Sequence, residues 1–144
     1  MSISAKVEYG CLAALELAMH YADGQPIQVR RISDRHQIPC QFLVQILLQL
    51  KAAGLVESIR GPHGGYRLAK DPADLTLAEI METMDRQFSE PALDCVEVPV
   101  APTVQVLKDT WRELAETQRQ ILNSVTLDVL AERVRVDAGA MYYI

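Results

Sequence analysis

GLVESIRGPHGGYRL, residues 54–68, predicts more about this protein than any other segment. Two short runs with apolar residues flank a turn that holds three glycines and a proline, which is the pattern of a β-hairpin with a long, flexible and basic tip. The preceding residues, Pro39 to Ala53, have the apolar spacing of a helix, and Gly54 ends that helix. A helix followed by such a hairpin predicts a winged helix-turn-helix, in which the helix enters the DNA major groove and the hairpin, or wing, lies on the flanking backbone.

The charges of the chain are unevenly distributed. The net charge is −5, but residues 28–70 contain seven lysines and arginines against two acids, so this window carries +5 and the remainder −10. A basic segment on an acidic body favours an encounter with DNA in which the basic side faces the phosphates. Taken without the hairpin, the cluster of basic residues is explained equally well as a solvated face. The seven basic residues are Arg30, Arg31, Arg35, Lys51, Arg60, Arg67 and Lys70.

Length and composition limit the class of protein. The 144 residues, 49% of them apolar, suffice for one domain with a proper core and an appendage. No apolar run reaches the roughly 18–20 residues that a membrane span needs. The first residues, MSISAK, lack the apolar core of a secretory signal. We therefore expect a cytoplasmic protein with no membrane partner.

Cysteine usage and the lack of catalytic motifs narrow the class further. Cys11, Cys40 and Cys95 are far apart and form no CxxC pair, so we expect neither a zinc site nor a disulfide framework. The sequence has no Ser/His/Asp order, phosphate-binding loop or paired-carboxylate motif, and we do not expect an enzyme. A winged helix used only for contact with other proteins is an alternative, which the basic window and the glycine-rich wing disfavour.

The N-terminal half predicts three helices. Residues 6–21 carry an apolar stripe and predict the first, and residues 25–28 an extended link. Residues 29–36 predict the second helix and residues 37–39 the turn before the third. Pro39 suits the first turn of that third helix, where its missing N–H costs nothing. We expect this helix to face the core with Leu43, Ile46, Leu47 and Leu50.

Glutamines recur every four residues in the third helix. Gln41, Gln45 and Gln49 therefore share one face, and a glutamine can bond an adenine edge bidentately, although a merely solvated glutamine gives the same pattern. Arg60, at the hairpin tip, is expected to hold the DNA backbone or the minor groove. The predicted DNA-binding residues are Arg30, Arg31, Gln41, Gln45, Gln49, Arg60, His63, Gly64, Gly65 and Tyr66.

The residues after the hairpin predict a helix and then a linker. Thr76 is expected to cap a helix that runs to Asp85, with Glu79 at the capping-box position. The following segment, 86–102, holds three prolines and predicts a linker or sensor loop. We expect a DNA-binding domain over 1–85, this linker, a long helix and a short terminal helix over 103–134, and a tail of uncertain order over 135–144.

The long helix after the linker carries an apolar seam. Apolar residues alternate at spacings of three and four, interrupted once by Gln118, which is an a/d pattern over three heptads. A lone helix with such a seam must bury it against its own domain or against a second copy, and the intervening linker favours a homodimer. The predicted dimer residues are Val104, Leu107, Trp111, Leu114, Ile121 and Val125.

Four motifs of the chain resemble the Rrf2 family of bacterial winged-helix regulators. They are ISDR at 32–35, FL at 42–43, LKAAGLV at 50–56 and RGPHGGY at 60–66, and the resemblance covers nearly the whole chain. That family includes the iron–sulfur cluster regulator, the nitric-oxide-sensitive repressor and the cysteine-metabolism repressor. The resemblance implies a dimeric DNA-binding transcription regulator, mainly α-helical with a small β-hairpin, whose winged helix-turn-helix is followed by a long C-terminal dimerisation helix.

The same resemblance bears on an iron–sulfur cluster. Cluster-bearing members usually have three cysteines in the loop before the long helix, where this chain has Cys95 alone. Some members take an acid in the first helix and a histidine at the end of the second from the partner subunit, and Glu8 and His36 occupy these positions. The resemblance thus implies a cluster or metal held by these three residues across a dimer, since thiolate, imidazole and carboxylate all ligate iron. The alternative is a cluster-free regulator of the same fold, controlled by a partner protein or a small ligand.

Overall fold

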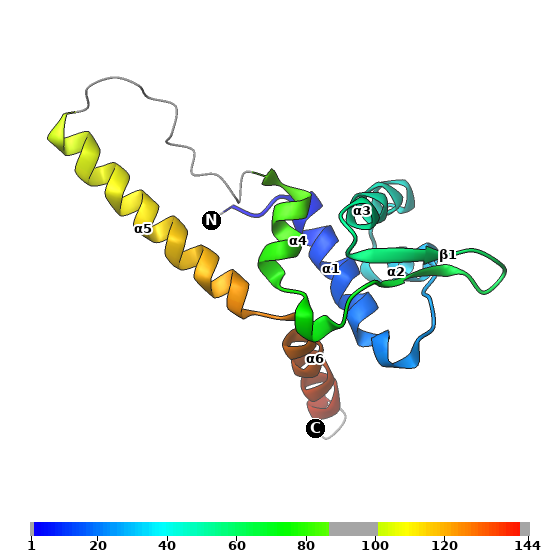
Figure 1. The fold of residues 1–144 in the computed structure, drawn as a ribbon. Coiled ribbons are helices and arrows are strands. Elements are labelled where there is room, and N and C mark those ends of the chain that lie inside the picture. The colour runs from blue at the N-terminus through cyan, green and yellow to red at the C-terminus, as the bar shows by residue number, and fades with distance from the viewer. Residues whose placement is uncertain (1, 87–100, 142–144) are drawn as a thin grey trace.

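The structure, a computed structural model, describes residues 2–86 and 101–141 (Figure 1). This part of the chain is mainly helical and holds one antiparallel two-stranded sheet, which confirms the fold class predicted from the sequence. Its helices and strands are α1 (Ala5–Met19), α2 (Val29–His36), α3 (Cys40–Ala52), β1 (Val56–Ile59), β2 (Gly65–Leu68), α4 (Leu77–Met84), α5 (Pro102–Ser124) and α6 (Leu127–Met141), with short 3-10 turns at Tyr21–Asp23 and Pro72–Asp74.

The hydrophobic core lies where α1, α3 and α4 pack against one another. α1 contributes Val7 and Leu17, and α2 contributes Ile32, each of them buried. Burial of such a side chain stabilises the fold by about 1.5–3 kcal/mol. The apolar residues predicted to point inward from α3 are fully buried, namely Leu43, Ile46, Leu47 and Leu50.

Side-chain caps start two of these helices. The Ser4 hydroxyl accepts a hydrogen bond from the N–H of Val7 at the start of α1. The Thr76 hydroxyl accepts one from the N–H of Glu79, 3.2 Å away, which confirms the predicted cap of α4. Each cap satisfies a backbone donor that the helix itself leaves without a partner.

Glycine residues permit the turn of the wing. β1 pairs with β2 in a register that joins Val56 to Leu68 and Ile59 to Gly65. A Cβ on Gly64 would lie 2.2 Å from the carbonyl oxygen of Ile59, and one on Gly65 would lie 2.2 Å from that of Ile27. Both positions therefore require glycine for steric reasons. The approach at Gly65 lets the extended link before α2 form a bridge to the hairpin through Ile27 and Tyr66.

α6 belongs to the N-terminal domain and is longer than predicted. It continues to Met141, past the expected end at Val134 and through part of the expected tail. Leu127 and Ala131 are buried in the core, and the helix packs on α1. The apolar surface of α1 supports this helix, whereas the local sequence pattern alone did not predict its length.

α5 stands apart from the other described elements over most of its length (Figure 1). It ends at Ser124, one residue before the predicted end of the seam. Val125 is half-buried, and its carbonyl oxygen accepts a hydrogen bond from the N–H of Leu77, 2.8 Å away. The backbone of Val125 thus joins the end of α5 to α4, and its side chain is less exposed than the other predicted seam residues. No helix in the described ranges is long and apolar enough to cross a membrane.

Candidate nucleic-acid interface

The turn between α2 and α3 is closed by local hydrogen bonds. Gln37 adopts a left-handed conformation with φ 53° and ends α2. The Ser33 hydroxyl donates to the carbonyl oxygen of Ile38 at 2.5 Å, and the Ile38 N–H donates to the carbonyl oxygen of Ser33 at 3.1 Å. Since Ser33 and Ile38 are both buried, this turn holds α3 at a defined angle to α2.

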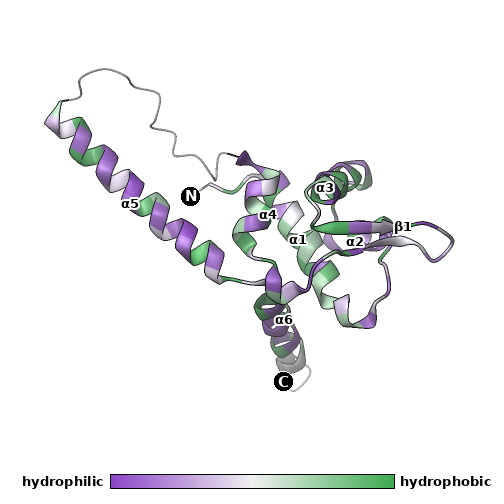
Figure 2. Ribbon diagram, viewed as in Figure 1, coloured by the Kyte–Doolittle hydropathy of each residue, from purple (hydrophilic) through white to green (hydrophobic). Residues whose placement is uncertain are grey.

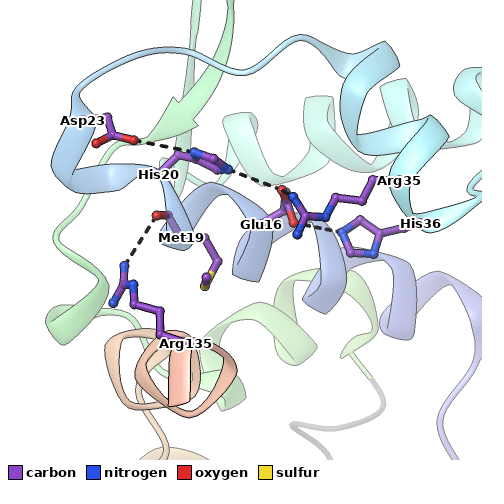
Figure 3. Close-up of polar contacts among 7 residues, drawn as sticks. All are labelled: Glu16, Met19, His20, Asp23, Arg35, His36 and Arg135. Atoms are coloured by element: carbon purple, nitrogen blue, oxygen red, sulfur yellow. Dashed lines mark hydrogen bonds and ion pairs between the residues drawn. The ribbon is translucent and has the colours of Figure 1, made fainter. Parts of the chain in front are cut away.

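A buried carboxylate ties the end of α2 to α1 (Figure 3). Glu16 is 6% exposed, and its Oε2 lies 3.0 Å from Nε2 of His36. Its Oε1 lies 3.2 Å from a guanidinium nitrogen of Arg35 and 3.5 Å from Nε2 of His20. Oε1 is buried and accepts no hydrogen bond of good geometry. Its contacts with Arg35 and His20 are therefore close approaches between side chains without an aligned hydrogen bond. Charged side chains are rarely buried unless they are paired, and these partners account for the burial of Glu16.

The sequence reasoning did not single out Glu16. The usable signal was an acidic residue placed between Leu15 and Leu17, in a helix whose middle is otherwise apolar. Two nitrogen-bearing side chains at the end of the next helix, the guanidinium of Arg35 and the imidazole of His36, were the second half of that signal.

Unpaired positive charge is concentrated on α2 and on the wing. Arg30, Arg31, Arg60 and His63 are exposed, and within the described ranges none of them forms an ion pair or a side-chain hydrogen bond. Arg30 and Arg31 also line a shallow surface depression, with Gln28, Asp34 and Arg35.

The other basic residues of the 28–70 window have intramolecular partners. Arg67 pairs with Glu57, Lys70 with Glu79 at 2.9 Å and Arg35 with Glu16, while Lys51 donates to the Ser58 hydroxyl at 2.8 Å. The charge without an acidic partner is therefore smaller than the sequence count. It lies on α2 and on the wing, together with Lys51 at the end of α3, whose hydrogen-bond partner is a neutral hydroxyl.

Only two of the three α3 glutamines lie on an exposed face. Gln41 and Gln45 are exposed. Gln49 is half-buried, and its amide nitrogen donates to the carbonyl oxygen of Thr83 in α4 at 2.7 Å. The structure thus separates Gln49 from the other two, because a neighbouring helix supplies an acceptor on that side of α3. This position corrects the prediction of one shared glutamine face.

The predicted wing residues divide in the same way. Arg60 and His63 are exposed near the tip, whereas Gly64, Gly65 and Tyr66 are half-buried. The two glycines allow the close backbone approaches described above, and Tyr66 forms the bridge to Ile27. The described contacts of these three residues shape the wing.

The residues predicted to ligate a cluster do not form a ligand set in the described part of the protein. Glu8 is exposed in the first turn of α1, and His36 instead contacts Glu16. Glu8 precedes Glu16 by eight residues, a rise of about 12 Å along the helix. Cys95 lies outside the described residues. Among residues 2–86 and 101–141 no group of three His, Cys, Asp or Glu side chains is placed to hold a metal ion.

Two further cysteines lie in the N-terminal domain. Cys40 is exposed at the start of α3, and Cys11 is half-buried in α1. Burial raises the pKa of the Cys11 thiol from 9.0 to about 11, and the negative charge of Glu8 adds to this rise. Cys11 is consequently a protonated packing residue at neutral pH.

These features define a winged-helix DNA-binding protein. They are the helix-turn-helix, its hairpin wing and the unpaired cations on α2 and on the wing, which precede and follow α3. The Rrf2 family model, described as an iron-dependent transcriptional regulator, matches residues 3–133. The chain therefore belongs to the Rrf2 family of transcription regulators, as the sequence motifs predicted.

Individual relatives agree with this assignment. The HTH-type transcriptional regulator IscR of Photobacterium profundum is 35% identical over 135 residues, which are 90% of this chain and 75% of the relative. The structure of CymR, the global cysteine regulator of B. subtilis, matches with a TM-score of 0.81 at 28% identity and covers 92% of this chain and 98% of that one. IscR of T. potens matches with a TM-score of 0.76 at 29% identity, over 92% and 88%. The family and these relatives are transcription regulators and not enzymes.

Proposed function

We propose that this protein is a homodimeric, sequence-specific transcription regulator in which each protomer places α3 in the major groove and its wing on the flanking backbone. The observation that carries the proposal is the placement of unpaired cations on α2 and the wing, at Arg30, Arg31 and Arg60, with the exposed His63 near the tip of the wing. Such cations can displace counterions from phosphates, which positions the protein without specifying sequence. Binding to the chromosome also assigns the protein to the cytoplasm in this proposal.

An apolar face of α5 supports the dimer. Figure 2 shows hydrophobic segments along this helix although it stands apart from the rest. Burying such side chains against a second copy would stabilise the pair, because it removes their remaining exposed apolar surface from water. In the single protomer the exposed fractions of the seam residues are 45% for Val104, 51% for Leu107, 47% for Trp111, 50% for Leu114 and 59% for Ile121.

Salt-dependent binding tests the DNA-binding geometry. The probe is a duplex from the region upstream of the protein's own gene. Arg60→Ala should weaken binding to all sequences and reduce the slope of log affinity against log salt by about 1, because one phosphate contact is lost. Lys70→Ala is the matched control, since Lys70 already pairs with Glu79. Gln45→Ala should instead weaken the preference among sequences. Unchanged affinity of Arg60→Ala at two salt concentrations would contradict the placement of the wing.

Redox or iron–sulfur control stays a prediction. The family description as iron-dependent supports it, and in the described protomer His36 contacts Glu16, so ligation by His36 would require this contact to change. If Cys95 holds a cluster, anaerobically prepared protein should absorb visible light and Cys95→Ala should not. Less than about a tenth of an iron per chain after anaerobic reconstitution would leave the alternative, a cluster-free regulator controlled by a partner protein or a small ligand.

A further inference from the structure

The outward face of α3 is set by the packing of its other side. At about 100° per residue, Gln41, Gln45 and Leu48 fall within an arc of about 60°, opposite the buried residues that face the core. All three are exposed, Leu48 at 44%. Val44 borders this arc and is half-buried. These four residues, the α3 reading face, are the side chains that a groove wrapped around α3 would meet.

The α3 reading face carries no charge. Its neighbours on both sides are turned away, since Lys51 bonds to Ser58 of the wing and Gln49 bonds to Thr83 of α4. The face therefore presents two amides and two aliphatic side chains. In particular it lacks a guanidinium or ammonium group, the usual partner of guanine in the major groove.

This set of groups matches one kind of base pair. A glutamine amide bonds the N6 and N7 atoms of adenine bidentately, and an aliphatic side chain contacts the C5-methyl group of thymine. We propose that α3 reads A·T base pairs, with Gln41 and Gln45 bonding adenine edges and Val44 and Leu48 contacting thymine methyl groups. This inference rests on the proposed function, because it requires α3 to lie in the major groove.

The methyl contacts give a direct test. Operators are first selected from a random duplex library with the full-length protein, and the half-site should be rich in A·T pairs at the positions that α3 covers. Each thymine is then replaced by deoxyuridine, which removes the methyl group and keeps the base pair. We expect affinity to fall about fourfold at each contacted thymine, the effect of one buried methyl group. A preference for A·T based only on a narrow minor groove would not respond to this change.

Variants assign the effect to named side chains. The Leu48→Ala protein should bind equally well to duplexes with thymine or uracil at one position of the half-site. The Val44→Ala protein should show the same loss of discrimination at a different position. Gln45→Ala is the matched control, which should lose affinity but keep the uracil effect. Circular dichroism checks that each variant is folded, which the exposure of Leu48 and Gln45 favours.

The possible failures can be told apart. Selection of a G·C-rich half-site, or equal affinity of the wild-type protein for thymine and uracil duplexes, would overturn the A·T inference and leave the regulator proposal standing. Failure to enrich any sequence, together with an unchanged affinity of Arg60→Ala for DNA, would overturn both.

Discussion

His36, the last residue of α2, contacts Glu16 in the last turn of α1 with 3.0 Å between Nε2 and Oε2 (Figure 3). Because the turn to α3 begins at the next residue, this contact ties the end of α2, where the turn begins, to α1. Arg35 approaches the same carboxylate from α2, so two consecutive residues hold α2 in place. The position of α3 relative to α1 thus depends on a polar contact as well as on apolar packing.

Removal of the buried charge should destabilise the domain. Glu16→Gln keeps the shape of the side chain and should lower the free energy of unfolding by about 1–3 kcal/mol, towards the lower end because Arg35 is 58% exposed and screened by water. Urea unfolding followed by circular dichroism measures this. Glu132→Gln, which removes an exposed ion pair with Arg135, should change stability by less than about 0.5 kcal/mol. Equal effects of the two substitutions would refute the role given to Glu16.

Alanine substitutions at two helical glycines are expected to have opposite effects on stability. Gly10 is buried, and a Cβ there would lie 2.6 Å from Cγ and 2.7 Å from Sδ of Met84. Gly10→Ala should therefore destabilise the fold by about 1–3 kcal/mol through overpacking. Gly139→Ala in α6 meets nothing within 4 Å and should instead stabilise it by about 0.5–1 kcal/mol, since alanine favours the helix. Thermal unfolding of both variants decides this, and stabilisation by Gly10→Ala would show that Met84 can move aside.

Substitution of Trp111 should weaken the dimer without unfolding the protomer. Its side chain is 47% exposed in the protomer, so Trp111→Ala should keep the helical content of the domain. Dimerisation should weaken by about 2–4 kcal/mol if the tryptophan anchors the interface, which sedimentation at micromolar concentration can detect. Glu116→Ala, an exposed change on another face of α5, should leave the association unchanged. A fully dimeric, folded Trp111→Ala protein would argue against this interface.

Cys11 should react slowly while the protein is folded. With its pKa raised to about 11, the thiol holds roughly a hundredth of the thiolate of a thiol at 9.0 when the pH is below both values. Alkylation by iodoacetamide at pH 8, read by mass spectrometry, should thus slow about a hundredfold relative to the unfolded chain.

The same pKa shift sets a pH dependence of stability. The native state holds the Cys11 proton more tightly than the unfolded state, so this contribution is complete below pH 9 and is lost as the pH rises towards 11. Cys11→Ala should flatten this part of the stability profile in urea titrations. A fall between pH 9 and 11 of the same size in both proteins would show that another group causes it.

Local patterns predicted most of the elements because their causes lie within a few residues. The cap at Thr76 needs only Glu79 three positions later. The turn of the wing depends on Gly64, whose close neighbours are the backbone atoms of Ile59, Arg60 and Gly61 a few residues before it. The apolar spacing of α3 identified its buried face correctly, since a helix repeats every 3.6 residues whatever it packs against.

Contacts between residues far apart in the chain decided the rest. Gln49 meets Thr83 and Val125 meets Leu77, and in each pair neither residue carries a local signal of its partner. Glu16 stands out in its apolar surroundings, but only the packing of α1 against α2 pairs it with His36. The same holds for α6, which packs on α1 at the other end of the sequence. Helix periodicity specifies which side chains share a face, but the neighbour that covers that face, and hence which glutamines stay free to bind a base, is settled only when the helices pack.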